Sequence, residues 1–330
     1  MMDYHSIYNA ETPDFLLRLC AAPSLLRLRD VGMNCGCEYT SFPLFASIAR
    51  YTRFEHCLGA ALIVWRFTGD VKQSVSALLH DVDTPVFAHV VDFLRGDYLE
   101  QTATESGTAA RIRGDRELVA RLGELGLRPG DVEDYHRFPI ADNDAPRLSA
   151  DRLDYTLGNA LNFSLAPAEE LAALFADLRV GKNEDGEDEL VFGSVQKARR
   201  FASLALACSK IYVCDADRYA MQLLSELLCD AIAAGVLCER DLGGTETALV
   251  EALCADAAFS ARWAAFRALS RTARAAAPDG REGWRRIPAK HRRIDPYVEG
   301  RGRVSALDAD FAAALDAFMK EKQDEYILGA

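Results

Sequence analysis

The chain has 330 residues, a formal net charge of −12 at pH 7 and a hydrophobic fraction of 50%. Core material is therefore not limiting, and the acidic balance disfavours sequence-independent binding to an extended nucleic acid. No window approaches the ~20 consecutive apolar residues of a membrane-spanning helix, so we expect a soluble protein without a membrane partner. A small anionic ligand in a locally basic pocket stays compatible with this composition.

The nine cysteines are scattered, mostly within apolar stretches, and no secretory leader pattern opens the chain. We therefore expect free thiols and a cytoplasmic location. Cys35 and Cys37 form the only close pair, but no second pair of Cys or His follows at zinc-finger spacing. Ordinary thiols are the favoured interpretation of this pair.

Helix-start signals recur along the chain. Thr12 and Pro13 fit an N-cap and a first helical position. The segment 54–67 places apolar residues on one stripe at three-to-four spacing, and 71–81 repeats the pattern, so two packed helices are predicted. Other residues that precede apolar-periodic stretches are Asp70, Asp115, Ser149 and Ser305.

The second half of the chain contains one clear interruption of the helical pattern. A polar run at 181–189 lies between apolar segments and predicts a β-hairpin with a long tip. A long helix or a broken pair is expected from 194 to about 234, another helix from Thr245, and an irregular or extended basic segment at 281–297. The sequence thus predicts an all-α, mainly helical fold with a small hairpin insertion. It places a soft boundary between a core at 1–177 and a helical lobe at 178–330.

Candidate metal ligands lie at the ends of three predicted helices. They are His56, the adjacent pair His80 and Asp81, and Asp151. Neighbouring residues on a helix project about 100° apart, so His80 and Asp81 can hold one ion only from a helix end, which the break at 83–85 supplies. Two imidazoles and two carboxylates suit manganese, iron, cobalt, nickel, zinc or magnesium. The sequence predicts one divalent metal whose identity stays open.

The order of these four residues resembles the HD superfamily of metal-dependent phosphohydrolases. The flanking words Thr-Arg-Phe-Glu-His at 52–56 and Asp-Arg-Leu-Asp-Tyr at 151–155, with His89 after the His-Asp pair, look like the deoxynucleoside triphosphate triphosphohydrolase branch. The resemblance covers roughly residues 50–160, with a looser helical similarity over 198–231. It implies an HD-domain fold, a phosphohydrolase activity and assembly into a homo-oligomer.

The resemblance also implies roles for individual residues. The four candidate ligands match metal positions, and Tyr155 matches a sugar-contacting position. A bound metal polarises a phosphoryl oxygen, while nearby cations neutralise phosphate charge. The phosphate-contacting positions are matched by Arg53, His89 and Arg152, and analogy alone places Lys210 and Tyr212 on the far wall of the site.

Several residues depart from the branch. Thr84, preceded by Asp83, stands where a second histidine is expected. Leu99 replaces a proposed catalytic histidine, and Asn159 replaces an aspartate near the sugar. The triphosphohydrolase mechanism therefore does not transfer intact. We name His89, Asp83 and Glu105 as candidate proton-transfer residues, together with Glu100, and prefer His89.

Plainer interpretations stand beside these roles. Arg53 is equally suited to pairing with Glu55, Arg152 to pairing with Asp154, and Tyr155 to a place in the core. His136 and His291 lie in polar loops where solvated surface is the default. The basic run at 285–293 is either an ion-paired surface or a site for an effector nucleotide or partner.

The sequence hypothesis is a phosphohydrolase acting on a phosphate ester or anhydride of a small anionic, nucleotide-like substrate. One alternative is a nucleotide-binding sensor that keeps the metal site without hydrolysis. Another is a di-iron oxygenase in which Asp83 helps to hold a second ion.

Overall fold

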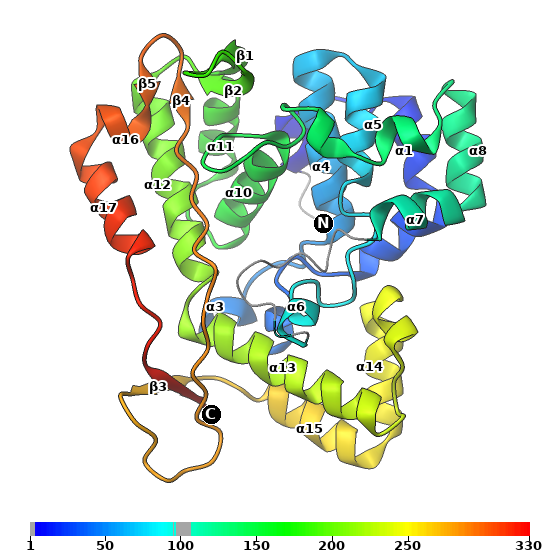
Figure 1. Ribbon diagram of the computed structural model, residues 1–330, viewed down its shortest axis with the longest axis vertical. Coiled ribbons are helices and arrows are strands. Elements are labelled where there is room, and N and C mark those ends of the chain that lie inside the picture. The colour runs from blue at the N-terminus through cyan, green and yellow to red at the C-terminus, as the bar shows by residue number, and fades with distance from the viewer. Residues whose placement is uncertain (1–3, 95, 97–106) are drawn as a thin grey trace.

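The computed structural model describes residues 4–94, 96 and 107–330, and these residues are mainly helical (Figure 1). The helices before the hairpin are α1 (Asp14–Cys20), α2 (Pro23–Leu26), α3 (Pro43–Ala46), α4 (Arg53–Thr68), α5 (Val71–Leu79), α6 (Val90–Leu94), α7 (Thr108–Gly114), α8 (Arg116–Glu124), α9 (Pro129–Val132), α10 (Ala150–Asn162) and α11 (Ala168–Phe175). Those after it are α12 (Val195–Ile211), α13 (Asp215–Ala233), α14 (Glu246–Ala255), α15 (Ala257–Arg267), α16 (Val304–Leu307) and α17 (Ala309–Met319).

Two small sheets accompany the helices, so the expected all-α class holds only approximately. The predicted hairpin is β1 (Leu178–Lys182) and β2 (Asp188–Phe192), paired antiparallel. Strand β2 also pairs in parallel with β4 (Tyr297–Val298), which pairs antiparallel with β5 (Gly302–Arg303). A second sheet joins β3 (Thr272–Ala275) to β6 (Tyr326–Gly329).

Most predicted helix starts are confirmed, and the long apolar stretch from 194 is a broken pair, α12 and α13. Capping side chains explain the starts, because each accepts a hydrogen bond from the backbone N–H three residues later and satisfies a donor that the helix leaves unpaired. These caps are Asp70, Asp115, Ser149, Ser194 and Thr245.

Two predicted starts were wrong. Helix α1 begins one residue late, with Pro13 rather than Thr12 at the N-cap. Ser305 lies inside the short helix α16, where Asp295 accepts hydrogen bonds from its backbone N–H and its hydroxyl. The last long helix starts at α17 instead, capped by Asp308.

Helices α4 and α10 pack closely, and two glycines make the close approach possible. A Cβ atom on Gly59 would lie 1.9 Å from Asp154 Oδ1, and one on Gly158 would lie 2.7 Å from Tyr51 Cζ. Asp154 and Tyr51 occupy the space that side chains would otherwise fill. This contact brings the start of α10 against the start of α4.

Buried apolar residues form two clusters. One surrounds α4, α5, α10 and α12, and the other surrounds α6, α13, α14 and α15. Both clusters contain residues from either side of residue 178, where the sequence predicts a domain boundary, and that boundary stays a prediction. All nine cysteines are free thiols. Among the described residues, no helix combines the length and the apolar character needed to cross a bilayer.

Candidate functional site

The four candidate metal ligands converge at the meeting point of α4, α5 and α10. His56 Nε2 lies 3.1 Å from His80 Nε2 and 3.0 Å from Asp151 Oδ1. Asp81 flanks this group, with Oδ2 3.7 Å from His80 Nε2 and 3.9 Å from His56 Nε2. Ligand atoms held ~2.1 Å from one ion are about 3–3.5 Å apart, so the separations among His56, His80 and Asp151 suit a shared cation, whereas Asp81 lies slightly farther out.

The outer nitrogens of both imidazoles bind the protein. His56 Nδ1 lies 2.7 Å from Asp154 Oδ2, and His80 Nδ1 lies 2.7 Å from the carbonyl oxygen of Ala77. Since both partners accept hydrogen bonds, each Nδ1 carries a hydrogen and each Nε2 points to the centre. When both rings are neutral, two Nε2 lone pairs and a carboxylate oxygen face one another, and a proton or a metal cation between them stabilises this arrangement. The residues therefore fit a divalent metal.

Asp154 binds the outer nitrogen of His56, on the side away from the site centre, a role that we did not predict from the sequence. Its carboxylate is fully buried and accepts hydrogen bonds from Tyr51 Oη at 2.7 Å and Tyr4 Oη at 3.4 Å. Such an outer partner fixes the orientation of a metal-binding imidazole. The available signal was the spacing, because Asp151 and Asp154 stand three apart and share one face of α10.

The electrostatics of the site favour positive charge. Burial alone lowers the pKa of His56, but hydrogen bonds with Asp151 and Asp154 raise it to about 10. The pKa of Asp151 lies well below its usual value because hydrogen bonds with His56 and His80 outweigh its burial. The carboxylates that stabilise this proton would attract a metal cation in its place.

Arg53 belongs to the site through Asp81. Its Nη1 donates to Asp81 Oδ2 at 2.6 Å, whereas Glu55 closes a capping box with Thr52. The pairing of Arg53 with Glu55 that the sequence left open is therefore not formed. Arg53 is buried and lines the cavity described next.

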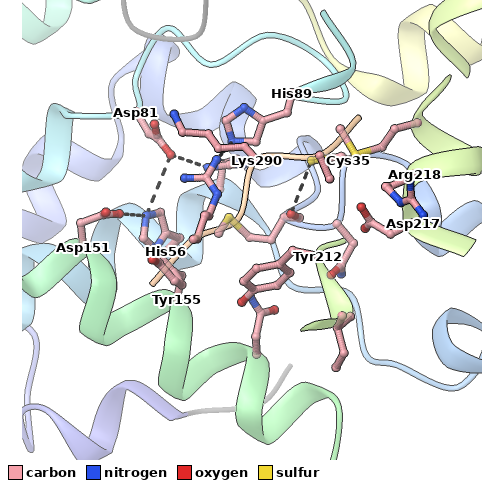
Figure 2. A pocket seen from close by; sticks show the side chains of 18 of the residues that line it. Cys35, His56, Asp81, His89, Asp151, Tyr155, Tyr212, Asp217, Arg218 and Lys290 are labelled. Carbon is pink, nitrogen blue, oxygen red and sulfur yellow. Dashed lines mark hydrogen bonds and ion pairs between the residues drawn. The ribbon is translucent and has the colours of Figure 1, made fainter. Parts of the chain in front are cut away.

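A cavity of about 190 Å³ extends from the metal ligands to Asp217 and Arg218 on α13 (Figure 2). Tyr155 and Tyr212 lie along it, and Asn159 Nδ2 donates to Tyr212 Oη at 2.7 Å. Asn159 Oδ1 is a buried polar atom without a hydrogen-bond partner among the described residues. The same holds for Nδ2 of Asn34, another residue that lines the cavity.

His89 lines the same cavity. Its Nδ1 lies 2.9 Å from Asp92 Oδ2, and its Nε2 lies 3.3 Å from Arg292 Nη2. Burial and the neighbouring charge of Arg292 lower the pKa of His89 despite Asp92. The imidazole therefore favours its neutral form, with Nε2 as the basic atom.

Other predicted site residues lie elsewhere. Asp83 binds Arg111 Nε at 2.7 Å and lines a separate cleft, because the chain after Asp81 turns toward α7. Lys210 is exposed on α12 and is not among the residues that line the cavity. Arg152 is held by Asp142 at 3.0 Å and by Asn143, not by Asp154. Glu105, Glu100 and Leu99 fall outside the described residues.

The two loop histidines are also placed. His136 has 58% of its side chain exposed and stacks on Tyr135, so the surface interpretation fits it. His291 is partly buried with its ring against Phe318.

Comparisons with known proteins agree with this geometry. No family model matches the chain. The chain is 28% identical over 215 residues to the metal-dependent phosphohydrolase cns2 of Cordyceps militaris, covering 62% of this chain and 56% of that protein. It is 25% identical over 204 residues to the uncharacterized protein YdhJ of Bacillus subtilis, covering 61% of each. The chain thus spans less than two thirds of either relative.

The chain resembles the HD-type metal-dependent phosphohydrolases. A crystal structure of a phosphohydrolase from Bacteroides thetaiotaomicron has the same fold, with a TM-score of 0.66 over 97% of this chain and 96% of that one at 15% identity. The resemblance drawn from the sequence motifs is confirmed at this level. The finer likeness to the deoxynucleoside triphosphate triphosphohydrolase branch is not confirmed.

Proposed function

We propose that this protein is a metal-dependent phosphohydrolase that cleaves a phosphate ester or anhydride of a nucleotide-like substrate. The observation that carries the proposal is the convergence of His56 Nε2, His80 Nε2 and Asp151 Oδ1 at one end of the cavity of about 190 Å³. A similar protein is named a metal-dependent phosphohydrolase, which supports the same reaction class.

The metal centre would be held by His56, His80, Asp81 and Asp151. A divalent ion there would polarise a phosphoryl oxygen and lower the pKa of a bound water. Arg53 fixes Asp81 through the 2.6 Å hydrogen bond between them.

We assign proton transfer to His89 Nε2. Asp92 accepts the hydrogen of Nδ1, so Nε2 can take a proton from the attacking water or return one to the leaving group. The lowered pKa of His89 keeps this nitrogen unprotonated near neutral pH, so it can accept a proton.

The organic part of the substrate occupies the rest of the cavity. Tyr155 and Tyr212 provide aromatic surface for a sugar or a base. Asn34 Nδ2 offers a donor and Asn159 Oδ1 offers an acceptor, and a buried polar atom without a partner is costly until a ligand satisfies it. A nucleoside combines apolar faces with polar edges and suits such a lining.

The test measures metal content and phosphate release across nucleoside mono- and triphosphates with manganese, iron, cobalt and magnesium. Asp81→Asn should lower turnover about 100-fold or more, because changing a ligand costs at least as much as changing its outer partner. Asp83→Asn is the matched control and should keep most of the activity, since Asp83 binds Arg111 instead.

Two outcomes would contradict the proposal. Saturable nucleotide binding without turnover by the metal-loaded protein would favour the sensor alternative. Oxygen consumption with two irons per chain would favour the oxygenase. In that alternative Asp83 was expected to help hold the second ion, but it binds Arg111 instead. A homo-oligomer and a cytoplasmic location stay predictions.

A further inference from the structure

Residues 285–295, here called the strap, run as an extended segment beside α12 toward β4 (Figure 1). One end is fixed at Ile287, which is 1% exposed in the second apolar cluster and whose carbonyl accepts a hydrogen bond from Arg218. The other end is fixed at Ile294 in the first cluster and at Asp295, whose N–H donates to the Pro146 carbonyl at 2.9 Å. The middle of the strap therefore passes from one cluster to the other.

Successive side chains of the strap face different surroundings. Lys290 and Arg292 line the cavity, where Lys290 is drawn with the metal ligands and His89 (Figure 2). His291, between them, packs its ring 4.8 Å from that of Phe318 on α17. Arg293 is exposed. Residues 290 and 292 share one side of the extended segment, and Ala289 lines the same cavity, so the anchors at both ends hold this part of the strap against it.

Arg292 approaches the reacting region directly. Its Nη2 lies 3.3 Å from His89 Nε2, and its charge adds to the burial that lowers the pKa of His89. At Tyr155, burial raises the pKa to about 12, and the charge of Arg292 partly offsets that rise. The guanidinium of Arg292 is therefore close to His89, the residue assigned to proton transfer, and to Tyr155 on the aromatic side of the cavity.

Acidic and basic side chains both line the cavity. The basic ones include Arg53, Arg218, Lys290 and Arg292. Asp81 and Asp151, whose pKa values lie below their usual value, bring negative charge to the same lining. A phosphate group brings further negative charge, which a cavity rich in carboxylates disfavours unless cations accompany it.

We propose that Lys290 and Arg292 bind the phosphate group of the substrate, so that the strap forms part of the active site. This inference rests on the proposed function and adds two substrate-binding residues to it. It divides the basic run at 285–293 into two groups. Arg285 forms an ion pair with Glu226 and Arg286 forms one with Asp324, as is common on a protein surface. Lys290 and Arg292 line the cavity.

The experiment measures binding of inorganic phosphate to the full-length, metal-loaded protein by calorimetry, where no turnover is required. Lys290→Met and Arg292→Met should each weaken phosphate binding about 10-fold to 100-fold, because each removes a charge-assisted hydrogen bond. The matched controls Arg286→Met and Arg293→Met remove exposed cations of the same strap and should change binding less than about twofold. Lys290→Arg keeps the charge and should restore most of the binding.

Unfolding midpoints and metal content confirm that each variant is folded and loaded. Phosphate binding that is absent in the wild type, unchanged in Lys290→Met and Arg292→Met, or weakened equally by all four substitutions to Met would overturn the inference. Kinetics separate it from the proposed function. Phosphate binding that depends on Lys290 and Arg292 but comes without hydrolysis would contradict the proposed hydrolase activity and support the phosphate site. Metal-dependent hydrolysis with an unchanged KM in Lys290→Met and Arg292→Met would contradict only the phosphate site.

Discussion

The two ends of the cavity differ in how the protein satisfies their polar atoms. At the metal end, both imidazoles have their outer nitrogens bound, and Asp154 accepts hydrogen bonds from two buried tyrosines. At the far end, Asn34 Nδ2 and Asn159 Oδ1 are buried without partners among the described residues. Asp217 there has a pKa that burial raises to about 8, against the hydrogen bond from Cys37.

This difference assigns separate tasks to the two ends. At the metal end, protein contacts fix both imidazole rings, although the buried Nε of Arg53 has no partner among the described residues. The far end keeps polar atoms whose hydrogen bonds a substrate would complete, so it is where the organic part of the substrate is selected. Changes at the metal end should therefore act on metal affinity and turnover, and changes at the far end on substrate affinity.

Among the changes that compare the two ends, Asp154→Asn should have the largest effect. Removing the carboxylate that fixes the His56 ring should lower metal affinity about 10-fold to 100-fold. Titration of the metal-free protein with manganese or zinc measures this change. Asp144→Asn, on an exposed acid of the preceding loop, is the control and should bind metal as the wild type does. Equal affinities in both variants would show that Asp154 does not organise the metal end.

A second change reaches the same contact without removing a polar group. Gly59→Ala places a methyl group 1.9 Å from Asp154 Oδ1, so α4 and α10 must separate or Asp154 must move. The cost should be about 1–3 kcal/mol of unfolding free energy, with weaker metal binding. Urea unfolding tests this against Gly123→Ala in α8, where the added Cβ meets nothing within 4 Å and should stabilise by about 0.5–1 kcal/mol.

Asp217, at the far end of the cavity, should make the free energy of unfolding depend on pH. Asp217 keeps its proton in the folded state up to about pH 8, but releases it near its ordinary pKa of 3.8 when unfolded. The stability from the protonated form is thus complete below about pH 4 and is lost as pH rises through 8. Asp217→Asn mimics the protonated acid and should gain stability over the wild type by about 1–2 kcal/mol between pH 5 and 9. Parallel unfolding curves at all pH values would contradict the burial of a neutral carboxyl there.

The smallest effect is expected from Tyr212→Phe. The phenol accepts the hydrogen bond from Asn159 Nδ2, so its loss should loosen the amide that faces the substrate. A net hydrogen bond contributes about 1 kcal/mol, which corresponds to a roughly fivefold rise in KM with kcat unchanged. A fall in kcat at constant KM would instead show that Tyr212 acts in the chemical step. The far end would then not be limited to substrate affinity.

Helix starts and the hairpin could be predicted from the sequence because the interactions that cause them lie within a few residues. Asp70, Asp115 and Ser149 cap helices through hydrogen bonds that span three positions, and the polar run at 181–189 contains the hairpin tip at 183–187. The order of His56, His80, Asp81 and Asp151 likewise indicated that these residues would meet.

The tertiary structure alone decided which neighbouring groups join the site. Asp83 is two residues from Asp81, yet Arg111 holds it in another cleft. Arg292 is 203 residues from His89 and lies 3.3 Å from it, because the strap is fixed to two separate apolar clusters. Such contacts depend on how helices distant in the chain pack together, and no pattern within one segment encodes them.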